Sequence, residues 1–293
     1  MNSRRDSDQH PKPATVLAAI QAPNTVRAKT LAETRADIQE RDCREVVLAR
    51  SHYITPFFIQ KILWIPVRLL FHVCAGFKVE GLENLHDLKT NAIFAANHCS
   101  ELDVVFLPAA LPFWSRFSPV FYVNRAQGMY GKNGFRRFLY NNSLFAIAGG
   151  HQYYPGLKDY EKSLINHIRL LKDGKNLYVF PEGGITPDGE IKHAHGGVAY
   201  LSLRTLTPIV PMSISGHFGM TPADFFLGRR RITVRFGRPI FPQELKSQIH
   251  ADRLADNIYK AQAEAVMGRV KELIVQVETK TSMNVHSSIY AEK

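Results

Sequence analysis

Short apolar runs alternate with helix-length amphipathic segments along the chain after residue 76. The runs predict strands at residues 77–79, 92–96, 120–123, 144–147, 177–180, 209–214 and 232–236. The segments between them predict helices at residues 101–110, 134–140, 157–171 and 196–204, and a last helix is expected at 251–278. Strands that alternate with helices are typical of the α/β class, with a largely parallel central sheet flanked by helices. Ligands of such sheets bind beyond the carboxyl ends of the strands.

The chain before this region has two parts of different character. Residues 1–50 are polar, mixed in charge and broken by prolines, so we expect a partly disordered extension. Residues 51–77 are rich in large apolar side chains but contain Lys61, Pro66 and Arg68. A membrane-spanning helix needs about 20 nearly uninterrupted apolar residues. The pattern therefore favours a pair of amphipathic helices at a membrane interface, with a buried core helix or a true span as the alternatives.

The net charge of the chain indicates a partner of negative charge. The 293 residues include 37 Lys and Arg against 26 Asp and Glu, a formal net charge of +11. Arg229, Arg230 and Arg231 form one of the densest basic clusters, and each basic residue near an anionic bilayer contributes about 1 kcal/mol of attraction. We expect an anionic membrane surface as partner, although an acidic carrier protein or plain solubility would also account for the charge. No groove-reading helix or stacking platform is legible in the sequence, so nucleic acid is not expected.

The segment from Asn97 to Asp103 carries the candidate chemistry. His98 falls in the turn between the strand expected at 92–96 and the following helix. On one continuous helix, five residues advance by roughly 500° and the side chains of His98 and Asp103 would diverge. From the preceding turn His98 can fold back, so that Asp103 accepts its Nδ1 proton and Nε2 is left as a general base. The alternative is a helix capped by Ser100 with a bystander histidine, and we do not expect Cys99 to act as a nucleophile.

Three further segments follow in order along the chain: Phe180-Pro181-Glu182-Gly183-Gly184, the run at 209–214 that contains Val210-Pro211, and the run at 235–240. Together with the Asn-His-x4-Asp segment, they resemble the glycerolipid acyltransferase family, which includes the 1-acylglycerol-3-phosphate acyltransferases. The resemblance covers about residues 78–245. It implies a glycerol-3-phosphate acyltransferase-like fold, an acyltransferase domain at 78–280 and a tail at 281–293.

The resemblance also implies a role for each matching position. His98 would deprotonate an acceptor hydroxyl, which attacks the thioester carbonyl of an acyl donor directly, and Asp103 would orient His98. Glu182 and Gly183 would help to bind the acceptor, and Pro211 would shape the wall of the pocket. Backbone N–H groups near Gly183 and Gly184 would stabilise the tetrahedral intermediate.

Two arginines that the family usually carries for the acceptor's phosphate are missing here. The run at 143–148 leads into Gly149-Gly150-His151 without an arginine, and Gly184 is followed by Ile185-Thr186. A bidentate arginine is poorly replaced by other side chains, so an acceptor without a phosphate monoester is an alternative. The candidate substitutes are Arg125, His151, Lys192, His193 and His195.

The sequence therefore predicts an acyltransferase that moves a fatty acyl group from acyl-CoA or acyl carrier protein to a lysoglycerolipid, most simply 1-acylglycerol-3-phosphate. The alternatives are a lysolipid acceptor without a phosphate monoester, a catalytically silent membrane-bound interaction protein, and a thioester hydrolase. No metal or organic cofactor is expected, and the three unpatterned cysteines indicate a reducing compartment. We expect a peripheral or monotopic protein at the cytoplasmic face of a membrane.

Overall fold

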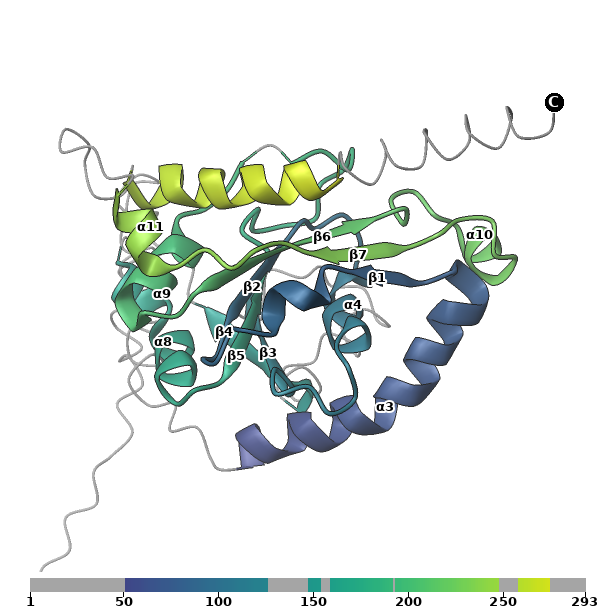
Figure 1. The fold of residues 1–293 in the computed structure, drawn as a ribbon, viewed down its shortest axis with the longest axis horizontal. Coiled ribbons are helices and arrows are strands. Elements are labelled where there is room, and N and C mark those ends of the chain that lie inside the picture. Colours follow the sequence, from purple (N-terminus) through teal and green to yellow (C-terminus); the bar gives the residue numbers. More distant parts are fainter. Residues whose placement is uncertain (1–50, 126–146, 154–158, 192, 248–257, 275–293) are drawn as a thin grey trace, which may run out of the picture.

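The computed structural model describes residues 51–125, 147–153, 159–191, 193–247 and 258–274. Seven strands form one sheet in the order β1-β7-β6-β2-β5-β3-β4 (Figure 1). They are β1 (Lys78–Glu80), β2 (Ile93–Ala96), β3 (Val120–Arg125), β4 (Gly150–Tyr153), β5 (Asn176–Val179), β6 (Ile209–Ser215) and β7 (Thr233–Phe236). Strand β7 pairs antiparallel with β6, and the other pairs are parallel. The prediction of a largely parallel α/β sheet is confirmed.

Helices cover both faces of this sheet. The described helices are α3 (Ser51–Ala75), the 3-10 helix η1 (Leu82–Leu85), α4 (Asp103–Ala110), α7 (Tyr160–Ser163), α8 (Ile165–Lys172), α9 (Gly197–Thr205), α10 (Pro222–Phe226), α11 (Pro242–Ser247) and a helix at 258–274. Phe94 and Ala96 of β2 pack in a core with α3 and α4, while Ile93 and Ala95 pack in a second core with α8, α9 and residues 258–274. Burial on both faces explains why the strand reads as an uninterrupted apolar run.

Several element boundaries differ from the sequence prediction. Of the strand expected at 144–147, only residue 147 lies in the described ranges and it is helical, whereas strand β4 begins at Gly150. His151 therefore lies inside a strand, paired with Val123, and the residues that follow β4 lie outside the described ranges. The single helix expected at 157–171 is two short helices that meet at Leu164. The helix expected at 134–140, the extension 1–50 and the tail 281–293 also lie outside the described residues.

The N-terminal apolar segment is one continuous helix, so the expected pair of helices is wrong. Helix α3 contains both Pro56 and Pro66. The stretch Ile54–Ala75 is long and apolar enough to cross a membrane by length and composition, and only 11% of its 18-residue apolar window is buried. The alternative of a buried core helix is therefore also wrong.

One side of α3 is fixed to the domain by polar side chains. Gln60 Nε2 donates to Val120 O at 2.7 Å, Trp64 Nε1 to Leu111 O at 2.9 Å, and Arg68 Nη1 to Ala109 O at 2.6 Å. These three donors are spaced four residues apart, so they share one face of the helix. The large apolar side chains exposed on the rest of the helix are Ile54, Phe58, Ile62, Leu63, Ile65, Leu69, Leu70 and Val73.

Candidate active site

The loop after β2 is anchored at its base by Asn97. The side-chain amide of Asn97 donates to Ile214 O at 2.9 Å, and its Oδ1 accepts from Ile214 N at 2.8 Å. This pair continues the ladder between β2 and β6 by one residue, through a buried side chain instead of the backbone. The next residue, His98, therefore leaves the sheet edge in a fixed direction.

His98 and Asp103 make the contact that their spacing predicts. His98 Nδ1 lies 2.9 Å from Asp103 Oδ2. The imidazole stacks on the Phe180 ring, with centroids 4.1 Å apart, and its side chain is 16% exposed. Within the described part of the chain Nε2 makes no hydrogen bond. His98 is thus held at one nitrogen and along its ring face, with the other nitrogen available to a substrate.

Asp103 is fully buried and held as a carboxylate. Its Oδ2 also accepts from the backbone N–H groups of Cys99, at 2.8 Å, and Ser100, at 3.0 Å. Burial alone would raise the pKa of Asp103, but the hydrogen bonds from His217 and His98 outweigh it and lower the pKa below its ordinary value. Helix α4 begins at Asp103 itself. The expected cap by Ser100 is wrong in detail, because the Ser100 hydroxyl accepts from Leu102 N instead.

Glu182 joins the same edge of the sheet, two residues beyond Phe180. Its Oε1 accepts from His98 N at 2.8 Å, and the N–H of Thr186 donates to His98 O at 2.8 Å. Both polar groups of the His98 backbone are therefore fixed by the loop after β5. Burial, supported by the charges of Asp103 and Asp188, raises the pKa of Glu182 to about 7.

The two glycines after Glu182 differ in their surroundings. Gly183 has φ +72°, and a Cβ there would lie 2.6 Å from Cδ2 of His195, so a side chain at this position would be strained and crowded. Its N–H donates to Phe180 O at 3.0 Å. The idea that this N–H stabilises an oxyanion is therefore wrong in this conformation, since it is already used in a turn. Gly184 is exposed, and a Cβ there would meet nothing within 4 Å.

The raised pKa of Glu182 predicts a pH-dependent stability. Between the ordinary value of 4.5 and about 7, the folded protein binds more protons than the unfolded chain, so the stability falls as the pH rises through this interval. Glu182→Gln keeps an acceptor for His98 N and removes the titration. We expect the melting temperature of the variant, relative to wild type, to rise between pH 5 and pH 8. Thermal unfolding followed by circular dichroism measures this.

Glu190→Gln is the matched control, because Glu190 is an exposed carboxyl of the same loop. Its melting temperature should follow that of wild type at every pH. Parallel curves for Glu182→Gln and wild type would show that Glu182 is charged in the folded protein across the whole interval.

The other residues singled out in the sequence lie in different places. Arg125 is the last residue of β3, and its side chain is outside the described set, as is Lys192. His151 is buried in β4, where its carbonyl oxygen lies 3.0 Å from His167 Nε2. His193 is exposed.

His195 is also exposed but lies beside the site. Its N–H donates to Pro181 O at 2.8 Å, and its ring borders Gly183. Of the candidate phosphate-binding residues whose side chains the structure describes, His195 is the one placed against the Glu182 loop. Pro211 is buried in β6 next to Gly237. It shares a groove with Arg235 and Arg238, apart from the His98 loop.

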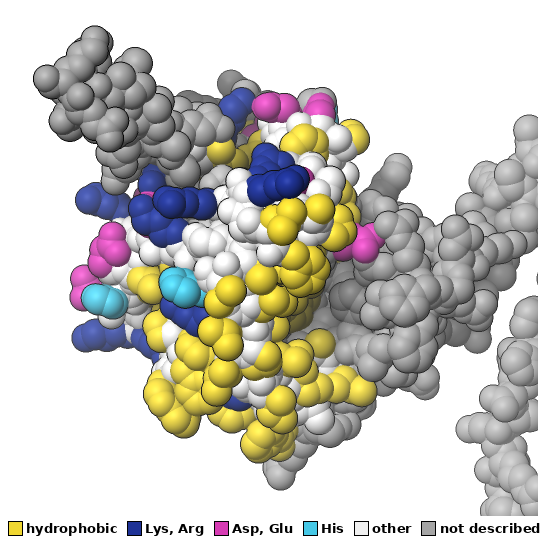
Figure 2. Space-filling model, turned by 90° about the vertical axis from the view of Figure 1, so that its right-hand side faces the viewer, with side chains coloured by type: hydrophobic (Ala, Val, Ile, Leu, Met, Phe, Trp, Pro, Cys, Tyr) yellow, Lys and Arg dark blue, Asp and Glu magenta, His cyan; other side chains and the backbone are white. Residues whose placement is uncertain are grey.

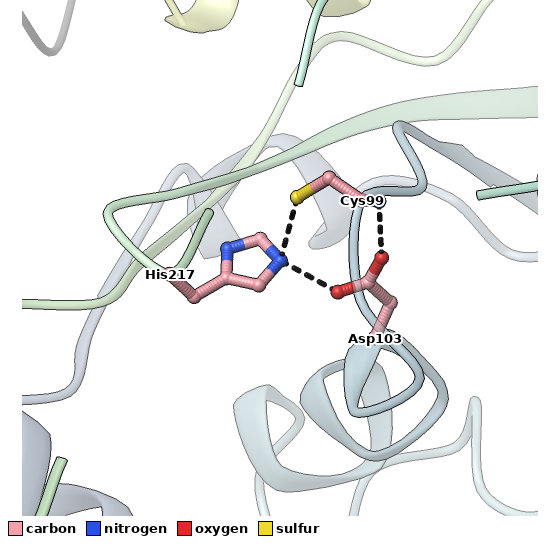
Figure 3. Close-up of side chains that lie close together, drawn as sticks. All are labelled: Cys99, Asp103 and His217. Atoms are coloured by element: carbon pink, nitrogen blue, oxygen red, sulfur yellow. Dashed lines mark hydrogen bonds and ion pairs between the residues drawn. The ribbon is translucent and has the colours of Figure 1, made fainter. Parts of the chain in front are cut away.

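Sequence reasoning missed His217, which reaches the site from the loop after β6 (Figure 3). Its Nε2 lies 2.6 Å from Asp103 Oδ1 and 3.0 Å from Cys99 Sγ. No motif marks this position, and 114 residues separate it from Asp103. The only sequence signal is the strand expected at 209–214, because the carboxyl ends of parallel strands lie at the same edge of a sheet.

The ligand atoms of Cys99, Asp103 and His217 lie within 4.8 Å of one another, so these side chains are the set in the described structure that a metal ion could use. Their separations of 2.6 and 3.0 Å are those of hydrogen bonds. Ligands of one zinc ion stand farther apart, at roughly 3.3 Å or more for bonds of about 2.0–2.3 Å. Burial, with the charges of Asp103 and Glu182, raises the pKa of Cys99 to about 12. The thiol is therefore protonated at neutral pH and is not an activated nucleophile.

Comparisons with known proteins agree with this arrangement. Residues 76–215 match a family model described as Acyltransferase. The chain is 23% identical over 197 residues to the chloroplastic 1-acyl-sn-glycerol-3-phosphate acyltransferase BAT2 of Brassica napus, which covers 64% of this chain and 50% of that protein. The chain thus spans about half the length of this curated relative. It also resembles the crystal structure of the 1-acyl-sn-glycerophosphate (LPA) acyltransferase PlsC from Thermotoga maritima, with a TM-score of 0.51 and 20% identity over 77% of this chain and 84% of that chain.

The fold and the family match together define the class of this protein, an acyl-transferring enzyme with a mostly parallel α/β sheet. Residues 76–215 therefore form an Acyltransferase-family region, and the chain is similar to acyltransferases of glycerolipids.

Proposed function

We propose that this enzyme transfers a fatty acyl group from a thioester donor, acyl-CoA or acyl carrier protein, to the free hydroxyl of a lysoglycerolipid, with 1-acylglycerol-3-phosphate as the first candidate. The observation that carries the proposal is the contact between His98 Nδ1 and the ionised, buried Asp103. A carboxylate at Nδ1 fixes the tautomer and leaves the lone pair of Nε2 to accept a proton, as a general base requires. Both comparison proteins are named as acyltransferases for this acceptor.

The reaction needs one base and no covalent enzyme intermediate. His98 Nε2 takes the proton of the acceptor hydroxyl as the oxygen attacks the thioester carbonyl. The new C–O bond gives a tetrahedral intermediate, which collapses by breaking the C–S bond. The departing thiolate takes the proton back from the His98 imidazolium, so the enzyme returns to its starting state. The protonated thiol of Cys99 has no part in these steps.

We assign Glu182 and Gly183 to the support of the acceptor site. Glu182 fixes the backbone of the base through His98 N, and its remaining carboxyl oxygen lies at the same edge of the sheet. The positive φ of Gly183 sets the turn that brings His195 against this loop. Pro211 belongs to a groove with Arg235 and Arg238, so in this proposal it contributes to a more distant part of the substrate, such as the acyl donor.

The membrane side of the proposal rests on the apolar face of α3 and the neighbouring α10. Helix α10 packs on α3 through Phe225 and Phe71, whose ring centroids are 5.9 Å apart, and it exposes Phe226 and Leu227. Figure 2 shows apolar side chains gathered on this face, with Lys and Arg side chains along its upper border. Because α3 is bonded along its length to the domain, we propose that it lies in the interface and makes the enzyme monotopic, at the cytoplasmic face.

Neutralising the basic cluster beside α10 tests the membrane partner. We expect Arg229→Gln/Arg230→Gln/Arg231→Gln to weaken binding to anionic vesicles by roughly tenfold at low salt, and by less at high salt. The loss falls below the sum for three free charges, because Arg229 pairs with Asp224 at 3.7 Å and Arg230 donates to Phe218 O at 2.7 Å. Vesicle co-sedimentation at several salt concentrations measures it.

A triple variant at Lys260, Arg269 and Lys271 is the matched control, since these exposed cations lie on the helix at 258–274, across the molecule from α3 (Figure 1). Equal losses in both triple variants would mean that net charge alone governs binding. Unchanged binding in the variant beside α10 would remove that cluster from the membrane surface.

A panel of acceptors tests the proposed substrate. Purified protein in vesicles receives a long-chain acyl thioester with lysophosphatidic acid, with other lysophospholipids, or with no acceptor, and the products are identified by mass spectrometry. Transfer to lysophosphatidic acid supports the first candidate. Transfer only to acceptors without a phosphate monoester supports the alternative, for which the lack of an arginine after Gly184 is the motivating observation. Thioester cleavage without acceptor would identify a hydrolase, and no reaction would favour an interaction protein.

A further inference from the structure

The two oxygens of the Asp103 carboxylate have different partners. Oδ2 accepts from His98 and from the backbone amides of Cys99 and Ser100. Oδ1 lies 2.6 Å from His217 Nε2, which is its hydrogen-bond partner within the described residues. Asp103 is therefore held between two imidazoles, and one of them, His217, has no place in the mechanism above.

The proton in the His217 contact can be assigned from the groups around it. An ionised carboxylate only accepts hydrogen bonds, so Nε2 of His217 carries the hydrogen. The His217 side chain is 2% exposed, and its Nδ1 is buried without a hydrogen-bond partner in the described structure. A second proton on Nδ1 would be a buried donor with nothing to accept it, which is costly. The hydrogen of this contact is thus assigned to His217 Nε2.

The local fold leaves the His217 ring little freedom. Gly216 turns the chain at φ +91°, and a Cβ there would lie 1.8 Å from Arg231 O, so the loop closes tightly on the neighbouring strand. The ring packs edge-on against Phe106 of α4, with centroids 5.1 Å apart. The ring also contacts the protonated thiol of Cys99, whose Sγ lies 3.0 Å from His217 Nε2.

We propose that His217 is a positioning residue for acyl transfer, which acts through Asp103 and does not touch substrate. Its Nε2–H holds Oδ1 so that Oδ2 stays directed at His98 Nδ1. The two backbone amides on Oδ2 would be satisfied in more than one rotation of the carboxylate, whereas His217 selects the rotation that also serves His98. The proposal rests on the function proposed above for His98 and Asp103.

Two substitutions separate the hydrogen bond from packing. His217→Leu keeps a similar volume and removes the donor, whereas the amide of His217→Gln can place an N–H near the position of Nε2. We expect His217→Leu to lower kcat roughly 10- to 100-fold, the usual size for a group that orients another functional residue, with KM unchanged. His217→Gln should recover kcat to within a few-fold of wild type. Equal losses in both variants would overturn the proposal.

The dependence of kcat on pH distinguishes the hydrogen bond of His217 from a role in packing alone. Without the His217 donor, the pKa of Asp103 rises, so protonation of Asp103 adds to the loss of activity at low pH and the acid limb of kcat against pH becomes steeper in His217→Leu. In His217→Gln the limb should keep its wild-type slope. Combination with Asp103→Asn is a second test, because residues that act as one unit are not additive. A full additional loss from His217→Leu in the Asp103→Asn background would overturn an action through Asp103.

Two further measurements separate this proposal from its rivals. Chelation of trace metals should leave activity unchanged, and loss that zinc restores would overturn the proposal in favour of a metal site at Cys99, Asp103 and His217. If wild type transfers no acyl group to any acceptor, the proposed function fails. The contact is then judged by nitrogen NMR of the imidazoles. The contact is supported if His217 is the Nε2–H tautomer and its signals change in Asp103→Asn. An Nδ1–H tautomer of His217 overturns the proposal.

Discussion

His98→Ala should abolish acyl transfer while the chain remains folded. A general base typically contributes about 10²- to 10⁴-fold to a rate. Two imidazoles contact Asp103 in the described structure, and His98 is the one with a partly exposed ring, whereas the second nitrogen of His217 is buried. His98 lies at a loop and stacks on one ring, so the loss of its side chain removes little core packing. Initial rates of acylated product, with circular dichroism of the same preparations, measure both effects.

His86→Ala serves as the control, because His86 is an exposed histidine at the end of η1. It should transfer acyl groups at the rate of wild type. Retention of more than a tenth of the activity in His98→Ala would exclude His98 as the base. A loss that circular dichroism traces to unfolding would instead assign His98 a structural role.

Asp103→Asn should lower kcat by roughly 10²- to 10⁴-fold, the range known for a carboxylate that orients a catalytic histidine. The amide oxygen of the asparagine must take the place of Oδ2, because three donors converge there. Its NH2 group then takes the place of Oδ1 and faces the N–H of His217 Nε2, so two donors oppose each other. His98 keeps an acceptor but loses the negative charge that stabilises its imidazolium form, so the chemical step is affected more than substrate binding.

Single-turnover rates across pH, together with KM, test this prediction. KM should change little, and the folded state should persist because the amide still accepts from Cys99 and Ser100. A loss smaller than tenfold would mean that Asp103 serves mainly to begin α4. A rise in KM at constant kcat would place the carboxylate in acceptor binding.

The sequence predicts the sheet well because its strands are buried on both faces. Ile93, Phe94, Ala95 and Ala96 form an apolar run that is hard to mistake for a solvent-facing helix. Strand β4 was misplaced for the opposite reason, since Gly150-His151-Gln152-Tyr153 begins with a glycine, is largely polar and lies at the edge of the sheet. The apolar residues just before it read as the strand instead.

Helix α3 shows where local rules mislead. Pro66 lacks an N–H and favours a break in a helix, yet hydrogen bonds from Gln60, Trp64 and Arg68 hold the helix to the domain on both sides of that residue. Tertiary contacts of this kind cannot be predicted from the local sequence pattern. His98 and Asp103 were predictable because they are five residues apart, whereas His217 meets them only through the pairing of β6 with β2.

In the proposed placement at a membrane interface, the exposed apolar side of α3 determines how the enzyme encounters the proposed lysolipid acceptor. An enzyme that rests on a bilayer meets a lysolipid by lateral diffusion within one leaflet, so the acceptor's amount per litre of solution does not describe its supply. The relevant variable is the mole fraction of acceptor among the surrounding lipids. Adding inert lipid to the vesicles should slow the reaction even when the total quantities of enzyme and acceptor stay the same. Diluting the whole suspension with buffer should not slow it.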